Sequence, residues 1–402
     1  MYDVVVVGAR CAGSPTAMLL ARKGYRVLLV DKAAFPSDTL STHFIHAPGV
    51  ARLKRWGLLD KVAASNCPPV ASYRLDFGPF ALTGSPPPVE GVATAYAPRR
   101  AVLDKILVDA AAEAGAELRE TFTMEDVCIE DGRAAGIRGR TRSGTRVTER
   151  ARLVIGADGL HSVVARTVGA AMDLEKPAVA CAYYTYWSGV SVQGVELYPR
   201  DGRTTIIFPT NDNLACTFME WPRDEFHVVR ADIEGQYLKT FEQLPALAER
   251  IRSGRRAERF MGTGDLPNFF RKPYGPGWAL VGDAGYHKDP NGAHGISDAF
   301  RDAELLADAV DSGFTGRQPL MEALAQYERQ RNESALPAFD LNFQFATLQP
   351  PPPETQALFG ALRGNQLETD RFIGVIAGTV PIPEFFAPDN IQRVLSSAAG
   401  NR

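Results

Sequence analysis

Residues 4–13 read VVVVGARCAG, and residues 25–31 read YRVLLVD. The valine run is typical of a buried strand, and it is followed by a glycine-rich turn, a helix over residues 17–23 and a second strand. This order predicts a βαβ unit. Gly8 permits the tight turn, Gly13 lets the helix pack close to the strand, and free N–H groups at the helix start attract a pyrophosphate.

Asp31 ends the second strand of this unit. An acid at this place accepts hydrogen bonds from a ribose 2′-OH. Arg10 stands where the middle glycine of such a turn normally lies, so we expect its side chain to point away from the phosphate path or to add a positive charge there. A plain strand-helix turn is the simpler alternative, but the flanking strand, helix and acid favour dinucleotide binding.

Two later segments repeat the design of a strand that runs into a turn. Residues 153–159 read LVIGADG, and residues 278–283 read WALVGD ahead of a predicted helix over residues 296–310. Both strands end in a Gly/Asp pair, and open α/β sheets place their ligands at this carboxyl edge. Either turn alone is an ordinary capped strand-turn-helix. Both of them, in this order after a βαβ unit, favour one cofactor site built from three turns.

The middle of the chain predicts a second domain. Residues 179–221 alternate with many aromatic side chains, which indicates an antiparallel sheet with one covered face, joined by strands from residues 72–82. Helices are expected over residues 101–114, 319–347 and 354–372. We therefore predict an α/β fold: a Rossmann-like dinucleotide-binding domain (1–70, 97–178 and 260–330), an inserted substrate domain (71–96 and 179–259) and a C-terminal helical segment (331–402).

Composition and charge exclude several classes of partner. The chain has 402 residues and a formal net charge of -3, so it offers no basic surface for nucleic acid. Its five cysteines are scattered, which argues against both a metal and a disulfide framework. Neither a targeting segment nor an apolar run of about 20 residues is visible. We expect a soluble, cytoplasmic protein without stable membrane insertion that acts on a small-molecule substrate; its oligomeric state stays open.

Three segments together resemble a known group of enzymes. They are residues 8–14 (GARCAGS), residues 35–43 (FPSDTLSTH) and the pair Arg100 and Asp104, followed by the two later turns. The chain resembles the FAD monooxygenases typified by para-hydroxybenzoate hydroxylase, with the related geranylgeranyl reductases and flavin-dependent halogenases. The resemblance spans residues 1 to about 330 discontinuously, and the first two segments look most like the reductase branch. It implies FAD as cofactor and NAD(P)H as a transient reductant.

The resemblance also implies roles for individual residues. Arg100 would reach FAD, Asp283 would bind the ribityl chain, and Asp158 would belong to the motif that serves FAD and the pyridine nucleotide. The helix beginning near Gly295 would aim its N–H groups at the negative charge of a reduced flavin, whereas Ala293 and Ser297 replace the group's usual Gly and Asn. The predicted cofactor-binding residues are Gly8, Arg10, Ala12, Gly13, Asp31, Lys32, Arg100, Val127, Asp158, Gly282, Asp283, Pro290, Gly295 and Ile296, and the predicted catalytic residues are His43, His294 and Pro290.

Several activities fit this pattern. The first is hydroxylation of an aromatic or polycyclic small molecule with NAD(P)H and O2. The second is reduction of carbon-carbon double bonds in an isoprenoid or polyene, favoured by residues 35–43. A halogenase is disfavoured because the sequence lacks a W-x-W-x-I-P stretch. A plain NAD-binding dehydrogenase and a flavin-binding protein without turnover are the remaining alternatives.

Overall fold

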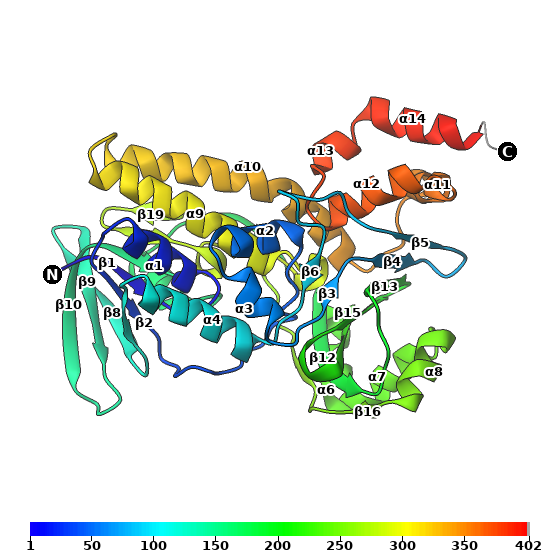
Figure 1. Ribbon diagram of the computed structural model, residues 1–402, viewed down its shortest axis with the longest axis horizontal. Helices are drawn as coiled ribbons and strands as arrows, with labels where there is room; N and C mark the ends of the chain where they lie inside the picture. The colour runs from blue at the N-terminus through cyan, green and yellow to red at the C-terminus, as the bar shows by residue number, and fades with distance from the viewer. Residues whose placement is uncertain (400–402) are drawn as a thin grey trace.

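The computed structural model describes residues 1–399, and one half of the molecule is built on a mainly parallel sheet (Figure 1). β1 (Tyr2–Val7) lies inside this sheet between β10 (Arg146–Gly156) and β2 (Val27–Val30), and both pairings are parallel. The sheet continues through β20 (Trp278–Leu280) to β19 (Tyr274–Gly275) on one side and to β7 (Glu117–Arg119) on the other. The strands predicted within residues 2–7, 25–31, 153–159 and 278–283 are therefore confirmed as neighbours in one sheet.

Both faces of this sheet are covered. One face packs on helices α1 (Gly13–Arg22), α4 (Arg100–Glu113) and α9 (Gly295–Phe314), so Val4 and Val6 lie in the first apolar core. The other face carries Val5 and Val7 and packs on β8 (Thr123–Glu130), β9 (Arg133–Arg140) and α5 (Val163–Thr167). Because β1 is enclosed on both sides, it reads as a continuous valine run and not as an alternating one.

A second sheet lies beside the first, at the lower right of Figure 1. Its strand order is β16 (Arg255–Arg256), β12 (Ala180–Ser188), β15 (Leu214–Pro222), β14 (Arg203–Pro209), β13 (Val195–Arg200), β4 (Tyr73–Asp76) and β5 (Ala81–Gly84), and β17 (Met261–Thr263) also pairs with β12. The strands from residues 73–84 thus join the aromatic strands of residues 180–222, as the sequence predicts. All of the pairings are antiparallel except that of β13 with β4.

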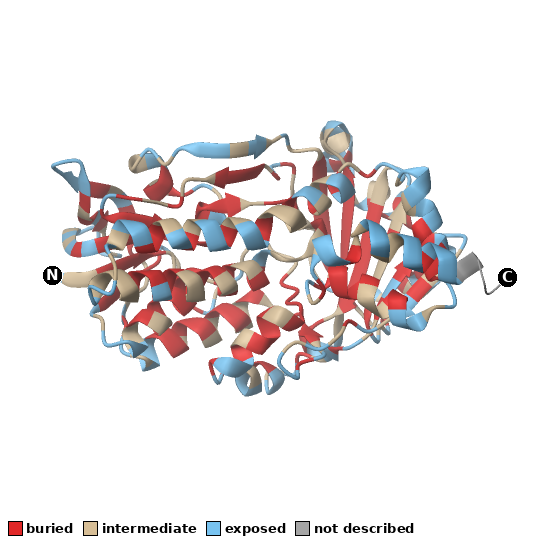
Figure 2. Cartoon of the chain, turned by 90° about the horizontal axis from the view of Figure 1, so that it is seen from above, coloured by how far each residue is buried: buried red, intermediate tan, exposed pale blue. Residues whose placement is uncertain are grey.

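The prediction that this second sheet has one covered face is wrong. Along β12, Tyr184 and Tyr186 enter one apolar core while Tyr183 and Trp187 enter another. The second core is closed by α6 (Phe226–Ala231), α7 (Ile233–Phe241) and α8 (Pro245–Ser253). Alternation along β12 therefore separates two buried faces, and Figure 2 shows the buried colour running through both halves of the molecule.

The C-terminal helices lie against the second sheet, beside β4 and β5 (Figure 1). α10 (Leu320–Ala346) confirms the predicted helix and runs through the predicted boundary at residue 331. The single helix predicted over residues 354–372 is instead two, α11 (Pro353–Leu362) and α12 (Gln366–Ile376), because Gly364 adopts a positive φ of 80° and Asn365 caps the next helix. α13 (Ile382–Phe385) and α14 (Pro388–Ala399) follow.

The remaining elements are short and connect these layers. Among residues 1–399, none of the helices combines the length and apolar character that a membrane crossing requires. The connecting elements are α2 (Ala47–Arg55), α3 (Leu59–Ala63), β3 (Pro69–Val70), β6 (Ala95–Tyr96), β11 (Met172–Lys176), β18 (Asn268–Arg271) and β21 (Tyr286–His287), with 3-10 turns η1 (Asn211–Asn213), η2 (Arg223–Glu225), η3 (Gly282–Ala284) and η4 (Pro290–Gly292).

Candidate active site

At the two ends of the first turn, no residue larger than glycine fits. Gly8 adopts a φ of 101°, and a Cβ atom there would collide with the carbonyl group of Ala157. A Cβ atom at Gly13 would collide with the carbonyl oxygen of Gly8. These contacts bring the start of α1 close to the end of β1, which leaves the helix N–H groups at the sheet edge.

The three predicted turns meet at one edge of the sheet. Val7 pairs with Gly156, and Gly156 pairs with Leu280, so the three strands end side by side. The third turn touches the first, because a Cβ atom at Gly282 would lie 2.7 Å from the Cβ of Ala12. A single group placed across this edge would therefore contact segments that are far apart in the sequence.

The Asp31 carboxylate stabilises the first turn through backbone hydrogen bonds. Its carboxylate accepts hydrogen bonds from the backbone N–H groups of Ala9 (2.7 Å) and Ala33 (2.8 Å). Asp31 is buried, and the neighbouring Lys32 is exposed. Each carboxylate oxygen can accept more than one hydrogen bond, so these contacts leave acceptor capacity for a ribose hydroxyl.

Arg10 does not obstruct the turn. Its guanidinium group bonds to Asp104 at 2.5 Å and to the Ser37 hydroxyl at 3.0 Å. Asp104 is fully buried and also accepts two hydrogen bonds from Arg100, at 3.0 and 3.1 Å, and one from the Cys11 thiol. This carboxylate ties the first turn to α4 and holds two guanidinium groups, those of Arg10 and Arg100, beside that turn.

The N-terminus of α9 is open to a ligand. Within residues 1–399, neither α1 nor α9 has a hydrogen bond from its N-cap side chain, but Gly13 and Ser14 at the start of α1 are buried and the Ser14 N–H bonds to the Arg10 carbonyl. Gly295 begins α9, and a Cβ atom there would meet nothing within 4 Å in the part of the chain described. Free N–H groups with open space in front of them suit an anionic or electron-rich group.

The other predicted cofactor residues have differing surroundings. Asp158 caps α5, because its carboxylate accepts hydrogen bonds from Ser162 and from the N–H of Val163 at 2.7 Å. Val127, a residue of β8, is buried in the core between β8 and the first sheet. Asp283 is exposed in η3, and its charge acts on Arg100. Ile296 is buried at the start of α9.

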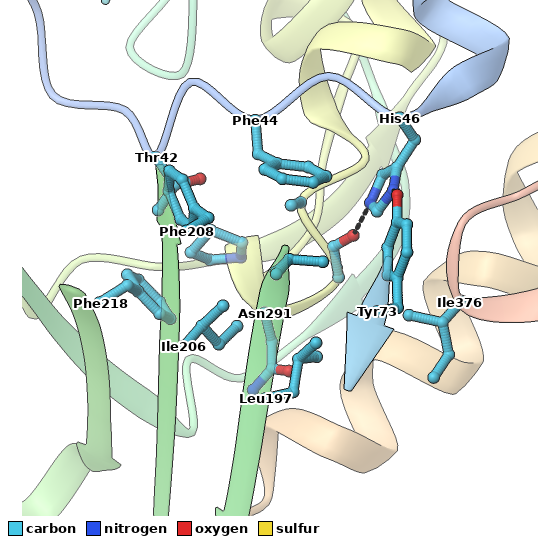
Figure 3. Close-up of a pocket in the computed structure, with 14 residues that line it drawn as sticks. Thr42, Phe44, His46, Tyr73, Leu197, Ile206, Phe208, Phe218, Asn291 and Ile376 are labelled. Carbon is cyan, nitrogen blue, oxygen red and sulfur yellow. Dashed lines mark hydrogen bonds between the residues drawn. The ribbon is translucent and has the colours of Figure 1, made fainter. Parts of the chain in front are cut away.

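A pocket lies where the second sheet meets the loop around Pro290 (Figure 3). The space between its lining atoms is about 400 Å³, part of it continuous with the solvent. In Figure 3, Phe44 and Phe208 approach it from one side and Ile376 of α12 from the other. Its lining residues are Thr42, Phe44, His46, Tyr73, Val195, Leu197, Ile206, Phe208, Phe218, Pro290, Asn291, Gly292, Ala293 and Ile376.

The histidines near this pocket are held neutral. His46 bonds to the Tyr73 hydroxyl (2.9 Å) and the Gly292 carbonyl (3.0 Å), and burial lowers its pKa to about 3. The Nε2 atom of His294 lies 2.8 Å from the Ile376 carbonyl, and desolvation lowers the pKa of His294 to about 4. His294 therefore links the start of α9 to the end of α12.

His43 lies behind the pocket wall, between the lining residues Thr42 and Phe44. Its ring nitrogens lie 3.0 Å from the Ala97 carbonyl and 2.9 Å from the Tyr186 hydroxyl. Burial lowers the pKa of His43 to about 3. Of the three predicted catalytic residues, only Pro290 lines the pocket itself.

These features fit FAD, and comparison with known proteins agrees. The two glycines of the first turn, the acid Asp31, the two guanidinium groups beside the turn and the open start of α9 suit a long dinucleotide that carries an electron-rich ring. Residues 1–260 match the family described as FAD binding domain. The chain belongs to this family of FAD-dependent oxidoreductases.

Individual relatives show how far the likeness extends. This flavoprotein is 30% identical to the digeranylgeranylglycerophospholipid reductase of Methanothrix thermoacetophila, over 83% of each chain. The structure of the flavin-dependent brominase Bmp2 matches with a TM-score of 0.83 and 19% identity, over all of both chains. PqsL of Pseudomonas aeruginosa, solved in complex with 2-aminobenzoylacetate, matches with a TM-score of 0.72 and 21% identity, over 94% of this chain and 99% of its own. The structural matches share the fold.

Sequence reasoning missed most of the pocket. Phe44 and His46 lie between the segment 35–43, which the sequence analysis singled out, and the start of α2. Extending that segment to α2 would have included both residues. Tyr73 comes from β4 and Ile376 from α12, and no local pattern connects these residues. Their proximity arises from the packing of α12 against the second sheet.

Proposed function

We propose that this flavoprotein is a monooxygenase that hydroxylates a compact, uncharged aromatic molecule with NAD(P)H and O2. The pocket beside Pro290 carries the proposal, because aromatic and aliphatic side chains make up most of its lining. Aromatic walls with a few polar groups are typical of sites for small apolar ligands.

The charge of the pocket argues for an uncharged substrate. Among the described residues that line it, none is Asp, Glu, Lys or Arg, and His46 is neutral. A carboxylate bound there would lose its water without gaining a cation, which costs several kcal/mol. Thr42 and Asn291 can instead bond to a hydroxyl, carbonyl or ring N–H group.

In this proposal each half of the molecule has one task. The residues of the three turns hold FAD: the start of α1 holds the pyrophosphate, Asp31 the ribose, Arg100 and Asp283 the middle of the cofactor, and Gly295 and Ile296 the flavin end. Bound FAD supplies the redox chemistry. Residues 71–96 and 179–259 orient the substrate, and Ile376 helps to exclude water.

A second candidate is reduction of carbon-carbon double bonds in an isoprenoid. It is supported by the curated relatives, since digeranylgeranylglycerophospholipid reductases match over more than four fifths of this chain. The aromatic side chains that line the pocket, among them Phe44, Phe208 and Phe218, favour the first candidate, because aromatic rings pack well against an aromatic substrate.

Oxygen uptake separates the two candidates. The FAD-loaded protein is given NADPH or NADH with phenols and indoles, and with the corresponding carboxylic acids. We expect the neutral compounds to stimulate oxygen uptake and to gain one oxygen atom from 18O2, and the acids to have little effect. Anaerobic reduction of a prenyl double bond, without stimulated oxygen uptake, would establish the reductase instead.

A pocket-filling variant provides the structural control. Leu197→Trp occupies the pocket, so substrate stimulation should fall at least tenfold while FAD stays bound. Leu238→Trp adds the same bulk on α7 at a side chain that is 51% exposed, and stimulation should persist. Equal effects of the two variants would show that the substrate binds elsewhere.

A further inference from the structure

Two buried acids meet where the second sheet approaches the Pro290 turn. Glu220 lies on β15 and is fully buried, and Asp289 directly precedes Pro290 and is 1% exposed. Asn291 joins them, because its side-chain amide donates to Glu220 and its backbone N–H donates to Asp289 at 3.0 Å. Asn291 also lines the pocket, so the two acids stand directly behind the pocket wall.

One oxygen of each acid has no partner. Within residues 1–399, the Oε1 atom of Glu220 and the Oδ2 atom of Asp289 are buried without a hydrogen-bond partner. Two ionised carboxylates so placed would repel each other and could not bond, since both only accept. With one proton between them, Glu220 and Asp289 hydrogen-bond to one another.

In the part of the chain described, neither acid forms an ion pair with a Lys or Arg side chain, and only the positive form of His287 opposes the rise in the pKa of Asp289 as a charge. The sheet partners of Glu220 are Ala182 and Thr204, which carry no charge. The backbone of Asp289 bonds to Asn268 and Asn342. Among titratable groups, only His287 of β21 acts on Asp289 besides Glu220. Burial, reinforced by the Asp289 charge, raises the pKa of Glu220 well above its usual range, and burial also raises that of Asp289.

We propose that Glu220 and Asp289 share one proton, and that this protonated pair joins the substrate sheet to the turn at Pro290. Both are positioning residues that act through Asn291 on the pocket wall. The shared proton rests on the burial of the two acids, on their common partner Asn291 and on their two unpartnered oxygens. Its effect on substrate binding rests on the proposed function.

The proposal sets a sign for the pH dependence of stability. The folded chain retains a proton that the unfolded chain releases above the ordinary range of carboxyl groups. The stabilisation is therefore complete at lower pH and is lost as pH rises through the raised pKa of the pair. For one proton, the folding equilibrium constant falls by up to about tenfold per pH unit.

Isosteric variants test the shared proton. Glu220→Gln and Asp289→Asn each supply a permanent N–H donor, so each variant should fold. In each, the fall of the folding equilibrium constant by up to about tenfold per pH unit should disappear. Glu249→Gln on the exposed side of α8 should keep the wild-type dependence. The measurement is urea unfolding of the FAD-loaded protein from pH 5 to pH 9, with infrared detection of the protonated carboxyl group.

Two results would overturn the proposal. The shared proton is refuted if Glu220→Gln keeps the wild-type pH dependence and the infrared band of a protonated acid is unchanged. The positioning role predicts that Glu220→Ala raises KM for a neutral aromatic substrate at least fivefold and that Glu220→Gln restores it. Equal KM values for the wild type and both variants would refute that role, and would leave the hydroxylation assay itself unaffected.

Discussion

At the scale of single residues, the buried carboxylate of Asp104 holds the site together. It accepts hydrogen bonds from Arg10, Arg100 and Cys11, and it is completely shielded from solvent. Removing one member of a buried ion pair leaves an uncompensated charge and typically costs 3–5 kcal/mol. The stability of the sheet edge where the three turns meet should therefore depend on this one side chain.

The variant Asp104→Asn tests this dependence. We expect it to lower the free energy of unfolding by about 3 kcal/mol or more and to weaken FAD binding, because Arg10 and Arg100 lose their shared anion. Asp109→Asn on the same helix removes only an exposed pair with Lys105 and should cost about 0.5 kcal/mol or less. Urea unfolding measures both, and similar losses would contradict the role of Asp104.

The glycines and acids of the three turns could be predicted because their constraints are local. A tight turn at Gly8 or a cap at Asp158 follows from a few neighbouring residues. The link between Arg10 and Asp104 could not be predicted, since it joins residues from separate segments of the chain. The same holds for the contact between His294 and the Ile376 carbonyl.

At the scale of elements, α12 is the piece that completes the pocket. Phe372 is buried between Phe359 and Phe385, with ring centroids 4.9 and 5.6 Å away. These residues share one apolar core with the strands of the second sheet. We infer that α11 to α13 fold together with that sheet.

Substitution on the two faces of α12 tests this inference. Phe372→Ala should lower the free energy of unfolding by about 3–5 kcal/mol in a single transition, because it leaves a cavity in a shared core. Leu367→Ala on the same helix, where the side chain is 69% exposed, should change it by less than about 0.5 kcal/mol. A separate early transition of the C-terminal helices would show instead that they fold independently.

Elements with strong periodicity were predicted well, and charged or interrupted ones were not. α9 and α10 follow their apolar spacing closely. β8 and β9 escaped prediction because Glu125, Asp126, Arg138 and Arg140 dominate their exposed faces. The break between α11 and α12 depends on a single positive φ at Gly364, which composition alone does not reveal.

At the scale of the whole molecule, buried neutral histidines set the response to acid. The pKa values of His43, His46 and His294 lie at about 3, 3 and 4 in the folded protein, below the ordinary value of about 6.5. The unfolded chain therefore binds protons that the folded chain does not. The contribution of these histidines to stability is complete above pH 6.5 and is lost as pH falls toward 4, by up to about 1.4 kcal/mol per pH unit for each histidine.

Histidine variants check this dependence. Between pH 6.5 and pH 4.5, His46→Gln should lose less free energy of unfolding than the wild type, by up to about 1.4 kcal/mol per pH unit, because it lacks one side chain that takes up a proton on unfolding. His161→Gln should leave the dependence unchanged, since that side chain is 76% exposed. Urea unfolding at several pH values gives both slopes, and an unaltered slope in His46→Gln would contradict the neutral state of His46.

The whole account depends on one FAD lying across the three turns, with its flavin end at the start of α9. Gly295 tests this directly, because in the described structure a side chain there would meet only open space. Gly360 on α11 has equally open surroundings and serves as the matched control.

The decisive measurement is the FAD content of purified Gly295→Val and Gly360→Val, read from their absorption spectra. We predict that Gly295→Val keeps its far-ultraviolet circular dichroism but loses at least nine tenths of its FAD, whereas Gly360→Val binds FAD as the wild type does. A fully loaded Gly295→Val protein would contradict the placement of the cofactor.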